Sequence, residues 1–236
     1  MTTNLPSGGP REPTDMAVRL EAAEAALRKA LAREVTLRNE LDHGIRNTMA
    51  VIRSVFLRTM DNSGSVNDAR DHFLGRLDAL VRYNARPMTK HHDSFDLETM
   101  IWDELISISL GSDERITISG PAVKLHQRAA NLVGLAVHEL VTNSLKFGLL
   151  GDLSKGGRLR VGWAVVNDLV HLEWNESGVA IVASAPIGSG FGRDFIENAL
   201  PYQLDARTHF EFVPGGLVCH IQFAVCDDVS NELFPA

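Results

Sequence analysis

Apolar residues recur at helical spacing through the first quarter of the chain. From residue 15 to about residue 60 they return every three, four or seven positions, and charged residues fill the positions between them. This period is typical of an amphipathic helix with a coiled-coil seam. It predicts one helix of about 45 residues, with Asp15 as its N-cap. The seam contains Leu20, Leu27, Leu31, Leu37 and Leu41.

A second amphipathic helix is expected after a turn. Residues 61–65 (DNSGS) are typical of a turn, and apolar residues from Phe73 to Val81 then repeat at helical spacing. Two helices joined in this way form a hairpin that leaves part of its apolar surface uncovered. Because pairing two hairpins into a four-helix bundle buries that surface, we expect a homodimer.

Beyond about residue 91 the pattern becomes mixed. Alternating apolar and polar residues predict short strands, and segments of period 3.6 predict helices, the first opened by Ser94 or Asp96. Helices grouped with largely antiparallel strands indicate a two-layer α/β sandwich, so the fold class is α+β. The expected helices cover residues 95–109, 126–149 and 192–200. The expected strands cover residues 115–119, 158–166, 169–174, 209–213 and 217–225.

These changes of pattern predict four segments. Residues 1–14 are polar and rich in Gly and Pro, which predicts a disordered tail. A helical domain is expected over residues 15–90 and the sandwich domain over residues 91–228. A short tail follows at residues 229–236.

Composition narrows the class of protein. With 236 residues, 44% of them hydrophobic, the chain can build one core and an appendage, and its net charge of −7 argues against a nucleic-acid or membrane-surface binder. Cys219 and Cys226 form no disulfide framework or metal motif, which fits a reducing compartment. No apolar run approaches the roughly 20 residues of a membrane span, and residues 1–13 lack a signal peptide's apolar core. We expect a soluble, cytoplasmic protein.

The helix expected at residues 126–149 is apolar but carries three polar groups within one sector. Glu139, Asn143 and Lys146 are spaced by four and three residues, so their side chains project in related directions. Carboxylate and amide oxygens suit Mg²⁺, and an ammonium group suits phosphate. The group therefore indicates a magnesium–nucleotide site. The alternative is a buried helix whose polar groups are satisfied by the backbone or by one another.

A histidine lies in the middle of the long N-terminal helix. His43 falls toward the flank of the seam, where its ring can meet solvent or a nucleotide, and Asn47 follows one turn later. Gly44 costs about 1 kcal/mol inside a helix, which suggests close approach or local flexibility. The alternative is a solvated histidine on a charged face.

Two glycine-containing segments complete the candidate chemistry. Where a predicted strand leaves the sheet, Glu176 could accept a hydrogen bond from an exocyclic amine such as that of adenine, and Gly178 lets the backbone approach a flat ring. Gly188, Gly190 and Gly192 directly precede a helix, whose free N–H groups and dipole could bind phosphate. A surface glutamate and an ordinary loop are the alternatives.

Together these motifs resemble the HWE group of bacterial sensor histidine kinases, over about residues 37–225. Residues 138–143 (HELVTN) match the N box, and residues 174–176 (WNE) match the Trp-x-Glu of the first glycine box. Residues 43–47 (HGIRN) are similar to the phosphoacceptor motif, which usually reads His-Arg-x-x-Asn. Two departures are Gly44 in place of Arg, and residues 177–180 (SGVA) in place of the usual Gly-Gly-Pro.

The resemblance implies a dimerisation and phosphotransfer hairpin joined to a Bergerat-type (GHKL) ATP-binding domain that uses ATP and Mg²⁺. It assigns Mg²⁺ to Asn143, a role as base or magnesium ligand to Glu139, and the phosphates to Lys146. Glu176 would recognise adenine, with Gly178 beside it. The second glycine box would contain Gly188, Gly190 and Gly192.

In the same resemblance His43, with Asn47 nearby, would take the γ-phosphoryl group and pass it to an aspartate on a response-regulator receiver domain. Residues 1–36 are too few for a PAS-like input module. We therefore expect a partner sensor protein upstream, or a longer chain.

Two other functions fit the same fold. A histidine phosphotransferase would share the helical bundle and His43 but would not use ATP. A non-catalytic dimeric signalling adaptor would use the ATP-binding fold as a docking surface. A serine kinase acting on an anti-sigma partner shares that fold but lacks the long histidine-bearing hairpin.

Overall fold

A computed structural model describes residues 13–61, 63–84, 94–110, 113–151, 156–179 and 190–225. The chain divides into two compact units, Met1–Ser54 and Val55–Ala236, each of which is described by itself. The predicted tails lie outside the described residues, apart from residues 13 and 14, as do Gly188 and Cys226.

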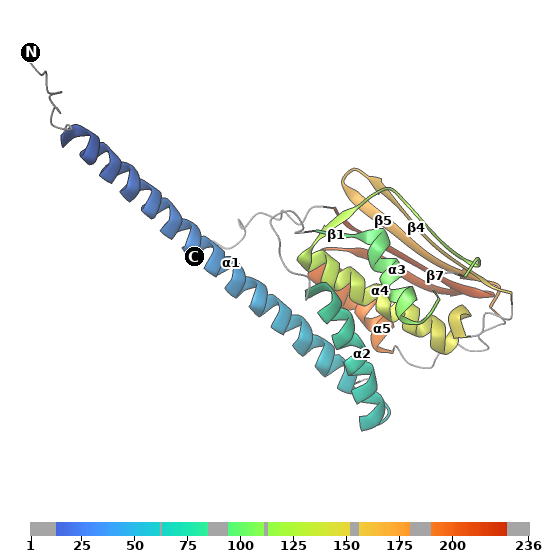
Figure 1. The fold of residues 1–236 in the computed structure, drawn as a ribbon. Coiled ribbons are helices and arrows are strands. Elements are labelled where there is room, and N and C mark those ends of the chain that lie inside the picture. Colours follow the sequence, from blue (N-terminus) through green and yellow to red (C-terminus); the bar gives the residue numbers. More distant parts are fainter. Residues whose placement is uncertain are drawn as a thin grey trace, which may run out of the picture. The chain divides into compact units, whose positions relative to one another are not determined.

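The first unit consists of most of helix α1 (Pro13–Asp61), the long helix that the heptad pattern predicts (Figure 1). Helix α1 begins two residues before Asp15, so the predicted N-cap is wrong. Proline is favoured in the first turn of a helix, because its missing N–H needs no partner there, and Pro13 takes that place. The five leucines of the seam are 52–62% exposed along this helix.

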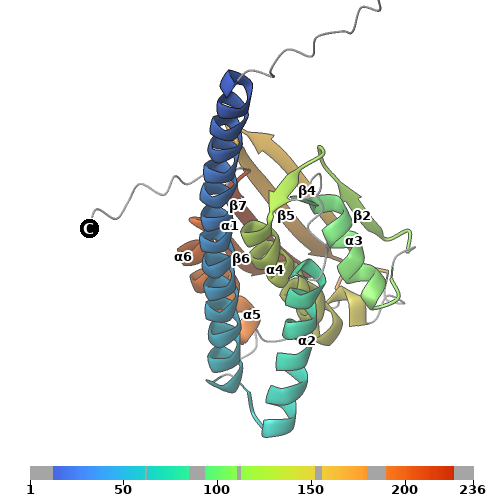
Figure 2. The same ribbon diagram turned by 60° about the vertical axis from the view of Figure 1, so that its left-hand side comes forward.

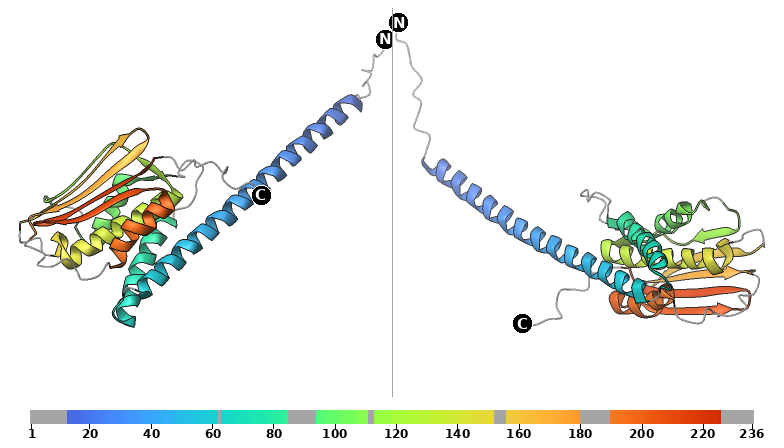
Figure 3. Two further views of the ribbon diagram at one scale, coloured as in Figure 1. Left: turned by 180° about the vertical axis from the view of Figure 1, so that it is seen from behind. Right: turned by 90° about the horizontal axis from the view of Figure 1, so that it is seen from below.

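In the second unit a five-stranded sheet has the order β2-β4-β5-β7-β6. Strand β2 pairs parallel with β4, and the other neighbours pair antiparallel, as the predicted two-layer sandwich requires. Helices α3, α4, α5 and α6 cover one face of this sheet (Figure 3). The strands are β2 (Ile116–Ser119), β4 (Arg158–Val166), β5 (Leu169–Ser177), β6 (Arg207–Val213) and β7 (Gly216–Ala224).

Two features of the strands differ from the prediction. Strand β5 continues to Ser177, because it pairs on both sides with β4 and β7, so Glu176 lies within the strand rather than beyond its end. A separate pair of strands, β1 (Ser94–Asp96) and β3 (Lys124–His126), was not predicted. Each has only three residues, too few to display an alternating pattern.

The helices of the second unit follow the predicted periods. Asp96 caps α3 by accepting a hydrogen bond from the Thr99 N–H at 3.0 Å. Phe56 and Phe73 pack edge to face, with ring centroids 5.4 Å apart, and join the end of α1 to α2. The helices are α2 (Val66–Asn84), α3 (Leu97–Ser107), α4 (Gln127–Phe147), the short 3₁₀ turn η1 (Leu149–Gly151), and α5 (Phe191–Asp194), which continues through the π-helical η3 (Phe195–Ala199) into α6 (Leu200–Leu204).

Helix α4 lies at the centre of the second unit. Its apolar residues are almost all buried, including Leu132, Leu135 and Leu140 at no more than 1% exposure. It packs against α2, α3 and α5–α6 (Figure 2). The polar residues of α4 must therefore find partners on neighbouring elements or face a cavity. In the described part of the chain, none of the helices is long and apolar enough to span a bilayer.

Candidate functional site

A cavity of about 170 Å³ opens beside helix α4. It brings together Asn143, Glu176 and Gly190, three of the residues that the sequence predicts for nucleotide binding. Apolar side chains form much of the remaining wall. The lining residues are Asn143, Ser144, Phe147, Gly148, Glu176, Val179, Gly190, Arg193, Phe210, Phe212, Gly216 and Leu217.

The carboxylate of Glu176 is held in place by two hydrogen bonds. The Trp174 indole N–H donates to Oε1 at 2.9 Å, and the backbone N–H of Leu149 donates to Oε2 at 3.0 Å. Glu176 is 2% exposed, and a side chain at Gly148 would collide with Oε2. Each carboxylate oxygen has a further lone pair, so an amine donor in the cavity can still be bound. The two residues of the Trp-x-Glu motif therefore act together.

The start of helix α5 packs directly on the polar residues of α4. A Cβ at Gly192 would lie 2.7 Å from Oε2 of Glu139 and 2.9 Å from Nδ2 of Asn143. Gly190 is the N-cap of α5 and lines the cavity. Gly178 has a φ of +77° and lies against the backbone of Gly157. Backbone conformation and close packing therefore account for glycine at this position. Gly192 is therefore required for close packing of α5 on α4.

Glu139 faces helix α2 and is absent from the cavity lining of the described residues. Nε of Arg76 donates to its Oε1 at 2.7 Å and Nη2 donates to its Oε2 at 3.1 Å. Nη1 of Arg76 donates to Oγ1 of Thr59 at 2.9 Å, and the guanidinium lies 3.6 Å from the ring centroid of Phe191. Both charged side chains are buried, so this ion pair occupies the carboxylate that the resemblance assigns to catalysis.

His138, the signature histidine, belongs to a second buried cluster. Its Nδ1 lies 3.1 Å from Oε2 of Glu104, a fully buried residue of α3. Arg82 donates to the same carboxylate at 2.6 and 2.7 Å, and the Tyr83 hydroxyl donates to it at 2.9 Å. Burial alone would raise the pKa of Glu104, but the hydrogen bonds from His138 and Arg82 outweigh it and lower that pKa. His138 therefore ties α4 to α3 and α2.

Lys146 also points toward α2. Its Nζ contacts Nε2 of His72, and burial together with the Lys146 charge lowers the pKa of His72. A neutral imidazole can accept the ammonium hydrogen bond. Lys146 is not among the described residues that line the cavity. Of the three polar residues predicted as one group, Asn143 lines the cavity while Glu139 and Lys146 contact helix α2.

His43 and Asn47 lie in the first unit. His43 is exposed on α1, and Nδ2 of Asn47 lies 3.2 Å from its Nδ1. A Cβ at Gly44 would meet open space, so packing among the described residues does not require glycine there. The structure thus places the predicted acceptor and its amide neighbour side by side on one helical face.

Sequence reasoning missed Arg76 and Glu104, although each leaves a signal. Arg76 follows Phe73 and Glu104 follows Ile101 by three residues, so both charges lie on the apolar stripe of their helices. A charge at such a position is expected to be buried and paired.

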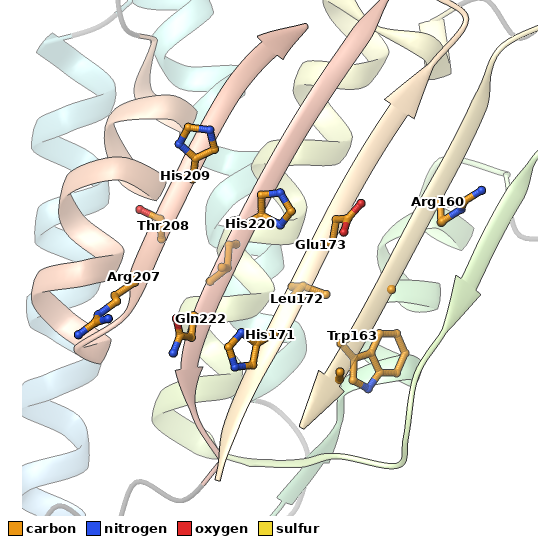
Figure 4. A pocket seen from close by; sticks show the side chains of 13 residues that line it. Arg160, Trp163, His171, Leu172, Glu173, Arg207, Thr208, His209, His220 and Gln222 are labelled. Carbon is orange, nitrogen blue, oxygen red and sulfur yellow. The ribbon is translucent and has the colours of Figure 1, made fainter. Parts of the chain in front are cut away.

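A larger hollow of about 590 Å³ lies on the face of the sheet opposite the helices (Figure 4). Its side chains form cross-strand rows, one of which runs through Glu173, His220 and His209. None of the predicted site residues lines it. Among the residues that the structure describes, no group of three or more His, Cys, Asp or Glu side chains is arranged to hold a metal ion. The smaller cavity therefore remains the candidate nucleotide site.

Comparisons with known proteins agree with the motifs. The model of the HWE histidine kinase family matches residues 40–122. Blue-light-activated histidine kinases of Brucella ovis and Brucella abortus are 27% identical over 212 residues, which cover 88% of this chain. The chain spans 42% of the length of these relatives. These matches confirm the predicted resemblance in sequence.

Solved structures agree with the fold. The histidine kinase domain of the Erythrobacter litoralis EL346 blue-light activated histidine kinase superposes with a TM-score of 0.54 at 16% identity, covering 76% of this chain and 91% of that domain. A longer structure of that kinase gives a TM-score of 0.51 at 15% identity, covering 75% of this chain and 62% of the other. The predicted α+β fold, a helical region followed by an α/β sheet domain, is confirmed.

Proposed function

We propose that this chain, which resembles the HWE histidine kinases in sequence and histidine kinase domains in fold, is an ATP-dependent protein-histidine kinase of a bacterial two-component system. The observation that carries the proposal is the cavity shared by Glu176, Asn143 and Gly190. A fixed acceptor, an amide and the start of a helix are groups suited to a nucleotide with its metal ion. We expect the kinase to work in the cytoplasm.

The adenine ring would bind at the Glu176 end of the cavity. The carboxylate is oriented by Trp174 and Leu149 and would accept a hydrogen bond from the exocyclic amine. Phe147 and Leu217 supply apolar surface beside the ring. Gly178 adjoins Val179 of that wall, but it lies against the backbone of Gly157 and is not among the described residues that line the cavity. This end of the cavity fits an aminopurine.

The phosphates would bind toward Asn143 and the start of α5. The Asn143 amide oxygen is suited to Mg²⁺, which when bound would neutralise charge on the phosphates. Backbone N–H groups around Gly190 and Gly192, with Gly188 of the same predicted box, would donate to phosphate oxygens. Glu139 and Lys146 are engaged by Arg76 and His72, and each would take part only after leaving that partner.

His43 is the proposed phosphoacceptor. A ring nitrogen attacks the γ-phosphorus, the bond from phosphorus to the bridging oxygen breaks, and ADP leaves with that electron pair. If the Asn47 amide turns its oxygen toward a protonated Nδ1, it holds the tautomer whose Nε2 carries the free lone pair. The phosphoryl group then passes to an aspartate of a receiver domain.

The partners follow from the long helix. Its seam of leucines is more than half exposed, and pairing with a second copy would cover it, which supports a homodimer. The remaining proposed partners are a response-regulator receiver domain and an upstream sensor protein.

The proposal is tested by incubating the protein with ATP and Mg²⁺ and mapping acid-labile phosphate. We expect the label on His43, none in His43→Gln, and much less in Asn143→Ala. His209→Gln is the matched control, because His209 is also an exposed histidine but lies on the outer face of the sheet. Incorporation by His43→Gln at the wild-type rate would overturn the proposal.

Calorimetry separates the kinase from a phosphotransferase, and phosphohistidine mapping separates it from an adaptor. A kinase binds ATP in the presence of Mg²⁺, whereas a phosphotransferase should bind none. An adaptor would form a stable complex with a receiver domain and yet yield no phosphohistidine under any condition.

A further inference from the structure

Arg193 is the one cationic side chain among the described residues that line the cavity. It belongs to α5, and its guanidinium makes a two-point ion pair with Glu197, one helical turn later. Nε lies 2.9 Å from Oε2 and Nη2 lies 3.1 Å from Oε1. Two parallel hydrogen bonds fix the plane of a guanidinium group as well as its position. Arg193 therefore presents an oriented flat cation at the wall of the cavity.

One face of this cation has an aromatic partner. The central carbon of Arg193 lies 5.7 Å from the ring centroid of Phe210, within the range of a cation–π contact. Phe210 lines the same cavity. A guanidinium stacks on flat π systems in a way that a lysine ammonium does not. The wall formed by Arg193 and Phe210 is therefore suited to a planar ring.

The direction of the ion pair favours contact with a base over contact with phosphate. Glu197 lies four residues beyond Arg193, so the pair runs along the helix away from Gly190, where the proposed phosphate-binding segment begins. Glu176, the proposed base-recognising carboxylate, lines the same cavity as Arg193. A guanidinium fixed in this way can cover the face of a ring whose amine edge is bound elsewhere in the cavity.

We propose that Arg193 stacks its guanidinium on the purine ring of the bound nucleotide, while Glu176 accepts a hydrogen bond from the exocyclic amine of that ring. This inference rests on the proposed function, because it places an aminopurine nucleotide in the cavity. It makes Arg193 a specificity-determining residue for the base. The two hydrogen bonds to Glu197 fix the orientation of the Arg193 guanidinium before the nucleotide binds.

The test compares Arg193→Met with Arg193→Lys, which retains the charge but not the plane. Binding of adenosine, ADP and ATP is measured with Mg²⁺ by calorimetry, adenosine by competition against ADP. We expect both variants to weaken all three ligands by the same factor, about 3- to 10-fold. Arg207→Met is the matched control, since Arg207 is an exposed arginine in the hollow on the other face of the sheet, and it should bind as the wild type does.

The outcomes separate this inference from the proposed function. If the wild type binds ATP and Arg193→Met binds adenosine, ADP and ATP with wild-type affinity, the stacking inference alone is overturned. It is also overturned if Arg193→Lys restores affinity, or if the loss grows with the number of phosphates, because both results would make Arg193 a phosphate ligand. A wild-type protein that binds no nucleotide would overturn the proposed function together with this inference.

Discussion

The polar side chains of helix α4 form two groups that differ in their partners: one group, called the paired side, is bonded within the protein, and the other, called the cavity side, lines a cavity, although Glu139 and Asn143 are only one turn apart. His138 and Glu139 contact residues of α2 and α3, whereas Asn143 and Ser144 lie at the cavity. The contrast teaches that one short motif can serve two purposes. Its first residues join helices, and its later residues are available to a ligand.

The difference follows from the energetics of buried charge. A buried carboxylate without a partner is strongly destabilising, so Glu139 and Glu104 each require a cation beside them, and α2 supplies Arg76 and Arg82. A neutral amide such as Asn143 carries no comparable penalty where it faces a cavity. The paired side of α4 should therefore govern stability, and the cavity side should govern binding.

The largest effect is expected from breaking the Arg76–Glu139 pair. Arg76→Met leaves a buried carboxylate without its cation and should lower the free energy of unfolding by about 3–5 kcal/mol, measured by urea denaturation. The control is the double variant Arg76→Met, Glu139→Leu, in which two apolar side chains should recover much of the loss. If Arg76→Met lowered the free energy of unfolding by less than about 1 kcal/mol, the assignment of Glu139 to the paired side of α4 would be wrong.

A methyl group at Gly192 should affect both sides of α4 at once. Gly192→Ala places a Cβ 2.7 Å from Glu139 and 2.9 Å from Asn143, so the neighbours must shift. We expect a loss of about 1–3 kcal/mol in unfolding free energy, with weaker ATP binding by calorimetry. Gly64→Ala, where a Cβ meets open space, is the control. If the Gly192 variant kept wild-type stability and affinity, α5 would not pack on α4 as described.

Acid should weaken the paired side through Glu104. Because the pKa of Glu104 is lowered in the folded protein from its ordinary value of 4.5, its carboxylate stabilises the fold above about pH 4.5. That contribution is lost as the pH falls below 4.5 and through the folded pKa. Unfolding free energies measured from pH 7 to pH 3 should thus fall less steeply for Glu104→Gln than for the wild type. Identical slopes would show that the Glu104 cluster does not favour the ionised form.

The smallest effect is expected at Lys146. Its variant tests whether Lys146 belongs to the paired side or to the cavity side of α4. Lys146 is exposed and contacts His72, so Lys146→Met should change the unfolding free energy by less than about 0.5 kcal/mol. Its affinity for ATP, measured by calorimetry, should stay close to that of the wild type. A loss that grows from adenosine to ATP would instead move Lys146 to the cavity side, where the resemblance to the HWE kinases puts it.

Most of the fold could be predicted because period and turn chemistry are local. The long helix, the buried helix α4 and strand β4 have the predicted types, and β4 has the predicted ends. Errors occurred where local pattern is weak. The start of α1 lies at a single proline, and β1 and β3 are too short to alternate.

The candidate site could be predicted in part. Asn143, Glu176 and Gly190 meet at one cavity, as the motifs suggested. The partners of Glu139 and His138 could not be found, because an arginine 63 residues away on another helix pairs with Glu139 only through tertiary packing. Arg193 was missed for a similar reason, since its place beside Phe210 depends on how α5 meets β6.

The hydrogen bond from Trp174 to Glu176 has a practical consequence for measuring ligands. Trp174 is 1% exposed, and its indole N–H donates to the Glu176 carboxylate, which lines the cavity. A ligand that donates a hydrogen bond to this carboxylate therefore alters the electric field at a natural fluorophore. The sequence contains two other tryptophans, Trp102 and Trp163, whose emission is removed in a variant with phenylalanine at both positions. In that double variant, the emission wavelength of Trp174 would report occupancy of the cavity without any attached dye.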